Sequence, residues 1–238
     1  MFDFSNQVVM ITGAAGNLGQ AVARAFWDAG AHLVLVDRTA ERLSLIYPGW
    51  GAHPRIYQAA PYDIMDMESV QSLVHRVANH YGRLDILVNT VGGYRAGLPV
   101  HLTSLDVYDQ MMALNARSAF ILSSAVAPVM IAQAAGKIIH VAGKAGLAGS
   151  ANAAAYSAAK SALIRLTESL SAELKENGIH VNCVLPGTIN TPKNREAMPN
   201  TDPSRWVEAS AVADVILFLA SPAARGIHGA AIPVFGKG

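Results

Sequence analysis

The sequence is poor in cysteine and in charge. One cysteine, Cys183, stands among 238 residues, which excludes an internal disulfide framework and a zinc site built from several thiolates. Only 15% of the residues are charged, and 18 basic against 17 acidic residues leave a formal net charge of +1. The sequence contains no basic block, so the charge pattern of a nucleic-acid-binding protein is missing. A hydrophobic content of 52% excludes a disordered chain.

The chain also lacks the signs of secretion and of membrane insertion. Its first residues, MFDFSNQ, contain neither a basic region nor an apolar one. Residues 118–135 are uncharged, but they include three serines, Pro128 and Gln133, so we expect a buried helix and not a membrane span. We therefore expect a cytoplasmic protein that binds neither nucleic acid nor membrane. The low charge indicates that part of the surface is covered in an oligomer.

Short apolar runs alternate with longer helical patterns along the whole chain. This alternation predicts right-handed strand–helix–strand units in one domain over residues 1–238, an α/β fold with a doubly wound (Rossmann), mostly parallel seven-stranded sheet and helices on both faces. Several helices should end at a glycine, namely Gly30, Gly82, Gly136 and Gly178. The irregular residues 187–206 are expected to be a loop that forms a substrate lid. The predicted strands are residues 8–12, 32–36, 55–58, 86–89, 137–141, 181–185 and 230–234, and the predicted helices are 18–29, 39–46, 67–81, 104–135 with an interruption, 153–176 and 210–220.

A glycine-rich turn joins the first strand to the first helix. Glycines there allow a sharp turn and the close approach of a pyrophosphate to the helix N-terminus, which favours an anion. Eighteen residues after the turn, the second strand ends at Asp37, whose carboxylate can accept a hydrogen bond from a ribose 2′-hydroxyl and would repel a 2′-phosphate. This favours NAD over NADP, although the neighbouring Arg38 could pair with a 2′-phosphate. The turn contributes Gly13, Gly16, Asn17, Leu18 and Gly19 to the predicted cofactor site.

Tyr156 and Lys160 are four residues apart on a predicted helix, so their side chains share one face. A lysine ammonium beside a phenol lowers the pKa of the phenol. We therefore expect Tyr156 to act as a general acid in reduction and as a general base in oxidation. The eight histidines show no metal-ligand spacing with carboxylates, and we expect no catalytic metal.

Together these motifs resemble the short-chain dehydrogenase/reductase family over essentially the whole chain. The resemblance implies that Asp63 and Ile64 flank an adenine, that Asn89 stabilises the central strand and that Gly92 lies beside the cofactor. It implies that Asn115 holds a water in a proton relay to Lys160, which also binds the nicotinamide ribose. It further implies a homo-oligomer, a tetramer or a dimer, assembled through the long helices predicted over residues 104–135 and 153–176. The turn after the sixth strand would hold the carboxamide and the pyrophosphate through Pro186, Gly187, Thr188, Ile189 and Thr191.

The sequence departs from the family pattern at three places. After the fourth strand, the usual Asn-Asn-Ala-Gly is replaced by residues 89–92, Asn-Thr-Val-Gly, which keep the glycine and not the alanine. Asn17 takes the place of the middle glycine of the loop, which a left-handed or turn conformation would allow. The catalytic serine of the family falls on Gly143. Losing one such oxyanion donor typically costs about 2.7–4 kcal/mol in rate. Catalysis could be impaired, another donor such as Lys144, Ser150 or the Gly143 N–H could replace the serine, or the substrate could need no such donor.

Within the family, the chain is most similar to dihydropteridine reductases, which lack this serine and prefer NADH. The similarity lies in Gly16–Gly19, in residues 91–97, in Ala142–Ala145 and in residues 185–199 followed by Trp206. It implies substrate contacts at Tyr94, Gly143, Lys144 and Trp206. We expect an NAD(H)-dependent enzyme that transfers hydride to or from a small carbonyl, quinonoid or imine-like substrate. The alternatives are a catalytically impaired nucleotide-binding or redox-sensing relative and a structural subunit of a larger assembly.

Overall fold

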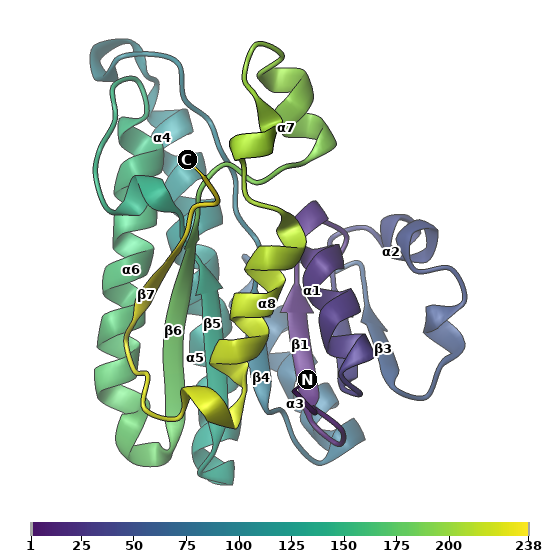
Figure 1. The fold of residues 1–238 in the computed structure, drawn as a ribbon. Coiled ribbons are helices and arrows are strands. Elements are labelled where there is room, and N and C mark those ends of the chain that lie inside the picture. Colours follow the sequence, from purple (N-terminus) through teal and green to yellow (C-terminus); the bar gives the residue numbers. More distant parts are fainter. Residues whose placement is uncertain (1, 238) are drawn as a thin grey trace.

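The computed structural model describes residues 2–237 and contains one seven-stranded, all-parallel sheet (Figure 1). The strand order is β3-β2-β1-β4-β5-β6-β7, so the predicted doubly wound α/β fold is confirmed. The strands are β1 (Val8–Thr12), β2 (His32–Val36), β3 (Ile56–Ala59), β4 (Ile86–Asn89), β5 (Gly136–Val141), β6 (Ile179–Pro186) and β7 (Ala231–Val234). The α-helices are α1 (Asn17–Asp28), α2 (Ala40–Ile46), α3 (Met67–Tyr81), α4 (Leu105–Met112), α5 (Ser118–Gln133), α6 (Ala154–Leu174), α7 (Pro192–Ala197) and α8 (Ala209–Ala220).

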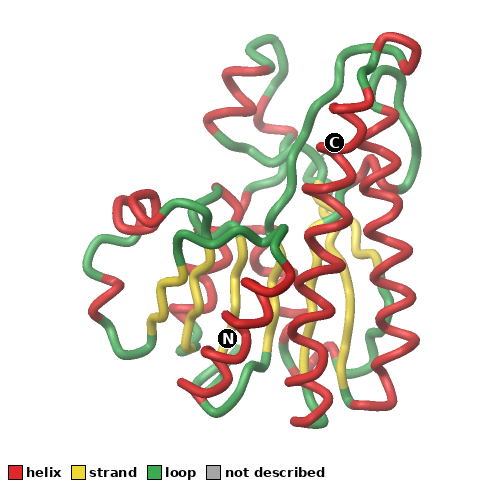
Figure 2. Tube along the Cα trace, turned by 180° about the vertical axis from the view of Figure 1, so that it is seen from behind, coloured by secondary structure: helices red, strands yellow, loops and turns green. Residues whose placement is uncertain are grey.

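The sheet is buried on both faces, which explains why its strands read as almost continuous apolar runs. Val9 and Ile11 of β1 face the cluster that contains the buried side chains of α1 and α8. Val8 and Met10 of the same strand face the opposite cluster, to which α3 and α5 contribute. α6 also packs on this second face, which is turned toward the viewer in Figure 2, through contacts near Cys183 of β6.

Glycine ends three of the helices as predicted and has a different role at the fourth predicted position. Gly82 and Gly178 are left-handed residues directly after helical segments, and Gly30 is left-handed directly after Ala29, the C-cap of α1. Gly136 does not end α5, because Ala134 is the left-handed cap there and Gly136 is already the first residue of β5. A side chain at Gly136 would collide with Met130, so close packing explains this glycine.

The predicted interruption between residues 104 and 135 is a π-helical turn, Ala113–Arg117, between α4 and α5. Such turns frequently occur at functional sites. The continuous helical stretch Leu105–Gln133 is long and apolar enough to cross a membrane by length and composition alone, a test that core helices of soluble proteins also pass. Its second part, α5, buries Leu122, Val126 and Met130 in the core, as the sequence predicts.

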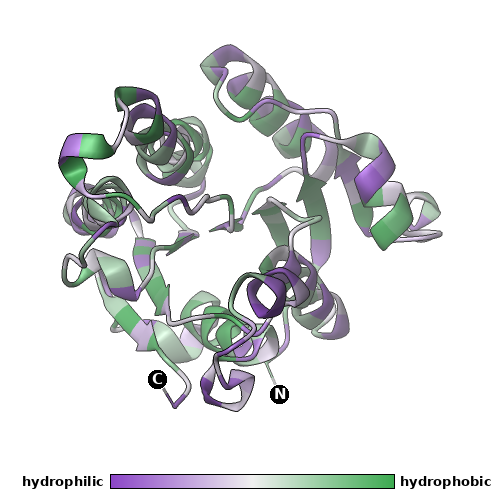
Figure 3. Cartoon of the chain, turned by 90° about the horizontal axis from the view of Figure 1, so that it is seen from above, coloured by the Kyte–Doolittle hydropathy of each residue, from purple (hydrophilic) through white to green (hydrophobic). Residues whose placement is uncertain are grey.

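Residues 187–206 lie above the carboxyl edge of the sheet, the edge that faces the viewer in Figure 3. The segment is not the irregular loop expected from the sequence, because it contains α7, which begins with Thr191 as its N-cap and Pro192 at its first turn. A parallel bridge between Ile189 and Val207 closes the base of the segment. The segment is therefore a structured insertion after β6 whose two ends lie side by side.

Candidate functional site

A cleft of about 510 Å³ opens at the carboxyl edge of the sheet. In open α/β sheets this edge is where ligands bind, at the point where the strand order reverses. Here the reversal lies between β1 and β4. The predicted site residues that line the cleft are Leu18, Gly92, Tyr94, Gly143, Lys144, Tyr156, Lys160, Pro186, Gly187, Thr188, Ile189 and Thr191.

Tyr156 and Lys160 lie on the first turns of α6, as the spacing predicts. The ammonium of Lys160 donates a hydrogen bond of 2.9 Å to the carbonyl oxygen of Val141 and lies 5.9 Å from the centre of the Tyr156 ring. Lys160 is buried, and burial lowers its pKa to about 8. At pH 7 the group is still mostly protonated, so it is a positive charge held at a fixed place in the cleft.

The pKa of Tyr156 differs from the sequence-based expectation. Burial, and to a smaller extent the neighbouring phenol of Tyr94, raise it to about 12. Lysine was expected to lower this pKa, but desolvation of the phenolate outweighs the attraction of an ammonium about 6 Å from the ring. The chain by itself therefore presents Tyr156 as a neutral phenol.

Asn115 lies in the π-helical turn and is buried. Its amide nitrogen donates to the carbonyl oxygens of Met111 and Gly93, both at 3.0 Å, and its Oδ1 accepts from the Gly93 N–H at 3.2 Å. A Cβ atom on Gly92 would lie 2.9 Å from that Oδ1 and 3.3 Å from Lys160 Nζ. Gly92, Asn115 and Lys160 are therefore brought together, as the resemblance implies.

The glycine-rich turn has the geometry of an anion site. Gly13 is left-handed, with φ +69°, and a side chain on Gly19 would collide with the carbonyl oxygen of Gly13. Asn17 is not left-handed, because it is the first residue of α1. Among residues 2–237 no side chain caps this helix, and its first turn carries no acid. Its N-terminal N–H groups are thus free to bind a negatively charged group.

Asp37 is buried at the end of β2 and is held by the glycine-rich turn. Its Oδ2 accepts from the N–H of Ala15 at 3.1 Å, and its Oδ1 lies 3.7 Å from Arg42 Nη1. Tyr47 donates from its hydroxyl to the carbonyl oxygen of Ala14 at 2.7 Å. Arg42 and Tyr47 were missed by the sequence analysis, because their contacts depend on how α2 folds back onto the turn. The one available signal was their position shortly after Asp37.

The strand ends near the cleft hold two further predicted residues. Asn89 accepts through Oδ1 from Thr12 Oγ1 at 2.8 Å and from the Val91 N–H at 3.1 Å, so it ties β4 to β1. Asp63 is exposed after β3, and its Oδ1 accepts from the Met65 N–H at 2.9 Å. Ile64 is buried beside it. These positions lie at the same carboxyl edge, beyond the residues that line the cleft.

The predicted substrate residues fall into two groups. The Tyr94 ring packs edge-on against Tyr156 at 4.9 Å, and Gly143 faces the Tyr156 hydroxyl, 3.5 Å from the place of a Cβ atom. The ammonium of Lys144 lies 5.1 Å from the Phe235 ring centre, at one side of the cleft. Trp206 and Ser150 are outside the cleft lining. The Trp206 backbone instead packs against Gly236.

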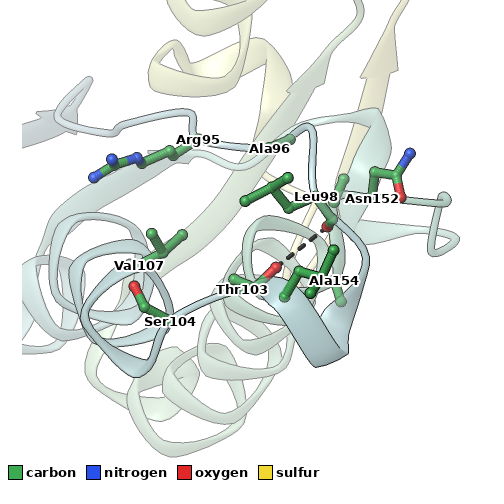
Figure 4. Close-up of a pocket in the computed structure, with 11 residues that line it drawn as sticks. Arg95, Ala96, Leu98, Thr103, Ser104, Val107, Asn152 and Ala154 are labelled. Atoms are coloured by element: carbon green, nitrogen blue, oxygen red, sulfur yellow. Dashed lines mark hydrogen bonds between the residues drawn. The ribbon is translucent and has the colours of Figure 1, made fainter.

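A smaller cavity of about 180 Å³ lies between the loop after β4 and the starts of α4 and α6 (Figure 4). Arg95 extends along one side of it, and Thr103 donates to the Leu98 carbonyl oxygen at 3.2 Å. Tyr156 and Lys160 are absent from its lining. The cleft at the carboxyl edge, which Tyr156 and Lys160 line, is therefore the candidate active site.

The parallel sheet, its switch point and the uncapped glycine-rich turn define a Rossmann-type dinucleotide-binding fold. Residues 7–202 match the family model of the short chain dehydrogenases, and the chain belongs to this family. It is 33% identical over 241 residues to a 3-oxoacyl-acyl-carrier-protein reductase of Thermotoga maritima, covering 97% of this chain and 96% of the relative. It is 31% identical over 246 residues to a D-threitol dehydrogenase of Mycolicibacterium smegmatis, covering 99% and 94%. A structure of NAD⁺-bound xylitol dehydrogenase superposes with a TM-score of 0.90 at 27% identity, covering 98% of this chain and 99% of that one.

Proposed function

We propose that this chain is an NAD(H)-dependent oxidoreductase that transfers hydride to or from a small carbonyl, quinonoid or imine-like substrate. The observation that carries the proposal is the position of Tyr156 and Lys160 in one cleft beside the glycine-rich turn. The related reductase and dehydrogenases act on substrates whose names imply a ketone or a secondary alcohol, which supports the same type of chemistry.

The residues present fit a nicotinamide dinucleotide. The pyrophosphate would be held at the uncapped start of α1 beside Gly13, Gly16, Asn17, Leu18 and Gly19, and the adenosine half by Asp37, Arg38, Asp63 and Ile64. The nicotinamide half would be held by Gly92, Lys160 and the turn over residues 186–191. When bound, the nicotinamide ring supplies the hydride donor or acceptor. Asp37 favours NAD because its carboxylate suits a 2′-hydroxyl.

Tyr156 is the proposed acid and base. Its raised pKa keeps the proton on Oη at neutral pH, so the hydroxyl can donate to a substrate oxygen or nitrogen as negative charge develops there. Lys160 holds a positive charge close to this proton and stabilises the phenolate that donation leaves behind. Asn115 fixes the backbone at Gly93, and we propose that it supports proton return to Lys160.

The absence of a side chain at Gly143 indicates the substrate class. A ketone gains a full negative charge on oxygen and needs a strong donor, whereas a quinonoid compound becomes aromatic on reduction and needs less help. Tyr94, a residue that is 72% exposed, offers a ring that can pack on a flat substrate next to Tyr156. Both features support a substrate of the quinonoid dihydropterin type.

The remaining features of the proposal concern the lid and the assembly. Asn194 and Met198, on and directly after α7, line the cleft, so residues 187–206 can cover a bound substrate. The long helical stretch that contains α4 and α5, together with α6, forms the proposed contact surfaces of a cytoplasmic homo-oligomer. The exposed Phe120 of α5 fits such a contact.

The decisive experiment measures NADH oxidation with quinonoid dihydropterin, with other quinones and with simple ketones, for the wild type and for Tyr156→Phe. Turnover that is lost in the variant while NADH still binds would support the proposal. NADH binding without turnover of any compound would favour the second candidate, a nucleotide-binding or redox-sensing relative, which the missing donor at Gly143 makes plausible. No NADH binding would refute both.

A further inference from the structure

The charged residues that line the candidate active site are both lysines. Among the described residues at the surface of the cleft, Lys144 and Lys160 carry charge, and no aspartate or glutamate is present. The groups that shift the pKa values of Tyr156 and Lys160 likewise include no carboxylate. The whole chain has 18 basic and 17 acidic residues, so the cleft departs from this balance toward positive charge.

The two lysines have different partners. Lys160 donates to the carbonyl oxygen of Val141 and serves Tyr156 in the proposed mechanism. Lys144 is exposed, belongs to none of the ion pairs among residues 2–237, and has its ammonium 5.1 Å from the centre of the Phe235 ring. The face of an aromatic ring attracts a cation but leaves N–H donors of the ammonium free for an anion.

The backbone of Lys144 is fixed relative to the proposed acid. Lys144 begins a short helical turn, Lys144–Gly146, directly after β5 and Gly143. The Gly146 carbonyl oxygen accepts from Ser161 Oγ of α6 at 2.9 Å, and a Cβ atom on Gly146 would lie 2.9 Å from the Lys160 carbonyl oxygen. The turn is therefore packed closely against the helix that carries Tyr156.

A substrate that reacts with Tyr156 lies next to this turn. Gly143 faces the Tyr156 hydroxyl, and Lys144 is the following residue. The Phe235 carbonyl oxygen would lie 3.0 Å from a Cβ atom on Gly187, which lines the cleft, so the Lys144 ammonium stands on the side of the cleft near the ends of β6 and β7. From there it can pair with a substrate group other than the reacting atom, because Gly143 is the residue that faces the hydroxyl.

We propose that Lys144 is a specificity-determining residue that binds the carboxylate of a flat quinonoid or carbonyl substrate. Substrates with an acid group are then preferred over neutral analogues, because the cleft offers them an unpaired cation and its described lining has no acid to repel them. The inference deepens the proposed function and rests on it. Tyr156 and the cofactor carry out the reduction, and Lys144 selects the substrate.

The test compares 9,10-phenanthrenequinone-2-carboxylate with the corresponding 2-carboxamide as NADH-dependent substrates. The two compounds share one flat ring system and have nearly the same size, and they differ by one negative charge. Reduction of either quinone takes up one hydride from NADH and one proton and gives the hydroquinone and NAD⁺. The values of kcat and KM are measured for the wild type, Lys144→Gln and Lys144→Arg. Lys175→Gln is the matched control, because it removes the same charge from an exposed lysine beyond the far end of α6.

The wild type should have a lower KM for the carboxylate than for the amide. In Lys144→Gln the ratio of the carboxylate KM to the amide KM should rise about fivefold, as expected for the loss of an ion pair that is partly open to solvent. Lys144→Arg should keep most of the preference, and Lys175→Gln should keep all of it. Added salt should raise the carboxylate KM more than the amide KM in the wild type, and this difference should vanish in Lys144→Gln.

A second readout measures binding without reaction. 2-Naphthoate and 2-naphthamide have no quinone to reduce, and their dissociation constants are measured by calorimetry with NADH present. The wild type should bind the naphthoate about fivefold more tightly than the naphthamide, and Lys144→Gln should bind the two about equally.

Equal KM values of the wild type for the two quinones would overturn the inference, and so would an unchanged KM ratio in Lys144→Gln. A fall in kcat by the same factor for both quinones, at an unchanged KM ratio, would also overturn it, because Lys144 would then donate to the reacting oxygen. Turnover of neither quinone refutes the proposed function instead. In that case, naphthoate binding that depends on Lys144 still supports the anion site, and binding that is independent of charge refutes it as well.

Discussion

Replacing Gly143 by serine should increase the reduction of simple ketones. The position accepts a side chain, because its backbone is extended, with φ 161° and ψ 162°, and because a Cβ atom would lie 3.5 Å from Tyr156 Oη and 3.8 Å from the Pro186 carbonyl oxygen, both ordinary contact distances. A serine hydroxyl one bond further out would reach the space in front of the Tyr156 hydroxyl. It would add a second donor where a substrate oxygen gains charge.

The size of the gain follows from the worth of such a donor. Removing an oxyanion-hole donor typically costs about 10²–10³ in kcat, so the gain in kcat/KM for ketones should be roughly 10–100-fold, since the surrounding cleft is not adapted to the new hydroxyl. Quinonoid substrates should gain little, because less charge develops on them. The assay compares initial rates of NADH oxidation on both substrate types.

Gly143→Ala is the matched control, because it adds the same Cβ atom without a donor. Alanine should give no gain with ketones, and at most a modest loss where substrate needs the space. Equal kcat/KM values for the serine and alanine variants on ketones would show that position 143 supplies no donor. A loss of activity confined to the serine variant would refute the reasoning equally.

Tyr156→Phe should lower turnover about 10²–10⁴-fold while leaving the NADH dissociation constant within about threefold, and turnover close to that of the wild type would exclude Tyr156 as the acid. In the reductive direction kcat/KM should fall as pH rises above about 8, where Lys160 loses its proton, and Lys160→Arg should remove this fall; a flat pH profile of the wild type up to pH 10 would contradict a charged Lys160. Gly92→Ala should lower turnover at least about tenfold, because its Cβ atom would lie 2.9 Å from Asn115 Oδ1 and would displace the Asn115 side chain. The proposed proton return depends on the position of Asn115 relative to Lys160. Gly149→Ala, with no atom within 4 Å of its Cβ atom, is the control, and equal turnover of the two variants would contradict this role.

The sequence predicted the fold well because each strand carries its own signal. Apolar runs with glycines and polar turns around them placed β1, β2 and β4 with the bounds that the structure has, and the other strands within one or two residues. Helix ends were harder, since Ala134 has no side-chain feature that favours a left-handed cap. α7 was missed because six residues are too few for a helical period to be recognised.

The candidate site was predictable where its residues are close together in the sequence. It was not predictable where the contacts join residues that are far apart in the sequence. Tyr156 and Lys160 are four residues apart, so one helix brings them together whatever the rest of the chain does. Arg42 reaches Ala15, 27 residues earlier, only because α2 folds back onto the glycine-rich turn. The Trp206 prediction relied on a sequence run shared with other proteins, and the structure places this residue beside Gly236.

Burial decides whether Tyr156 carries a proton at neutral pH. The spacing of Tyr156 and Lys160 in the sequence does not reveal this burial. Burial favours the neutral form of any group, so it raises the pKa of Tyr156 to about 12 and lowers that of Lys160 to about 8. At neutral pH, which lies below both pKa values, the cleft holds a phenol that keeps its proton and an ammonium that keeps its charge. That pair can give a proton to a substrate at once, whereas it can accept one only after further positive charge lowers the pKa of the phenol. At neutral pH the two side chains therefore favour proton donation by Tyr156, and we expect reduction to be faster than oxidation there.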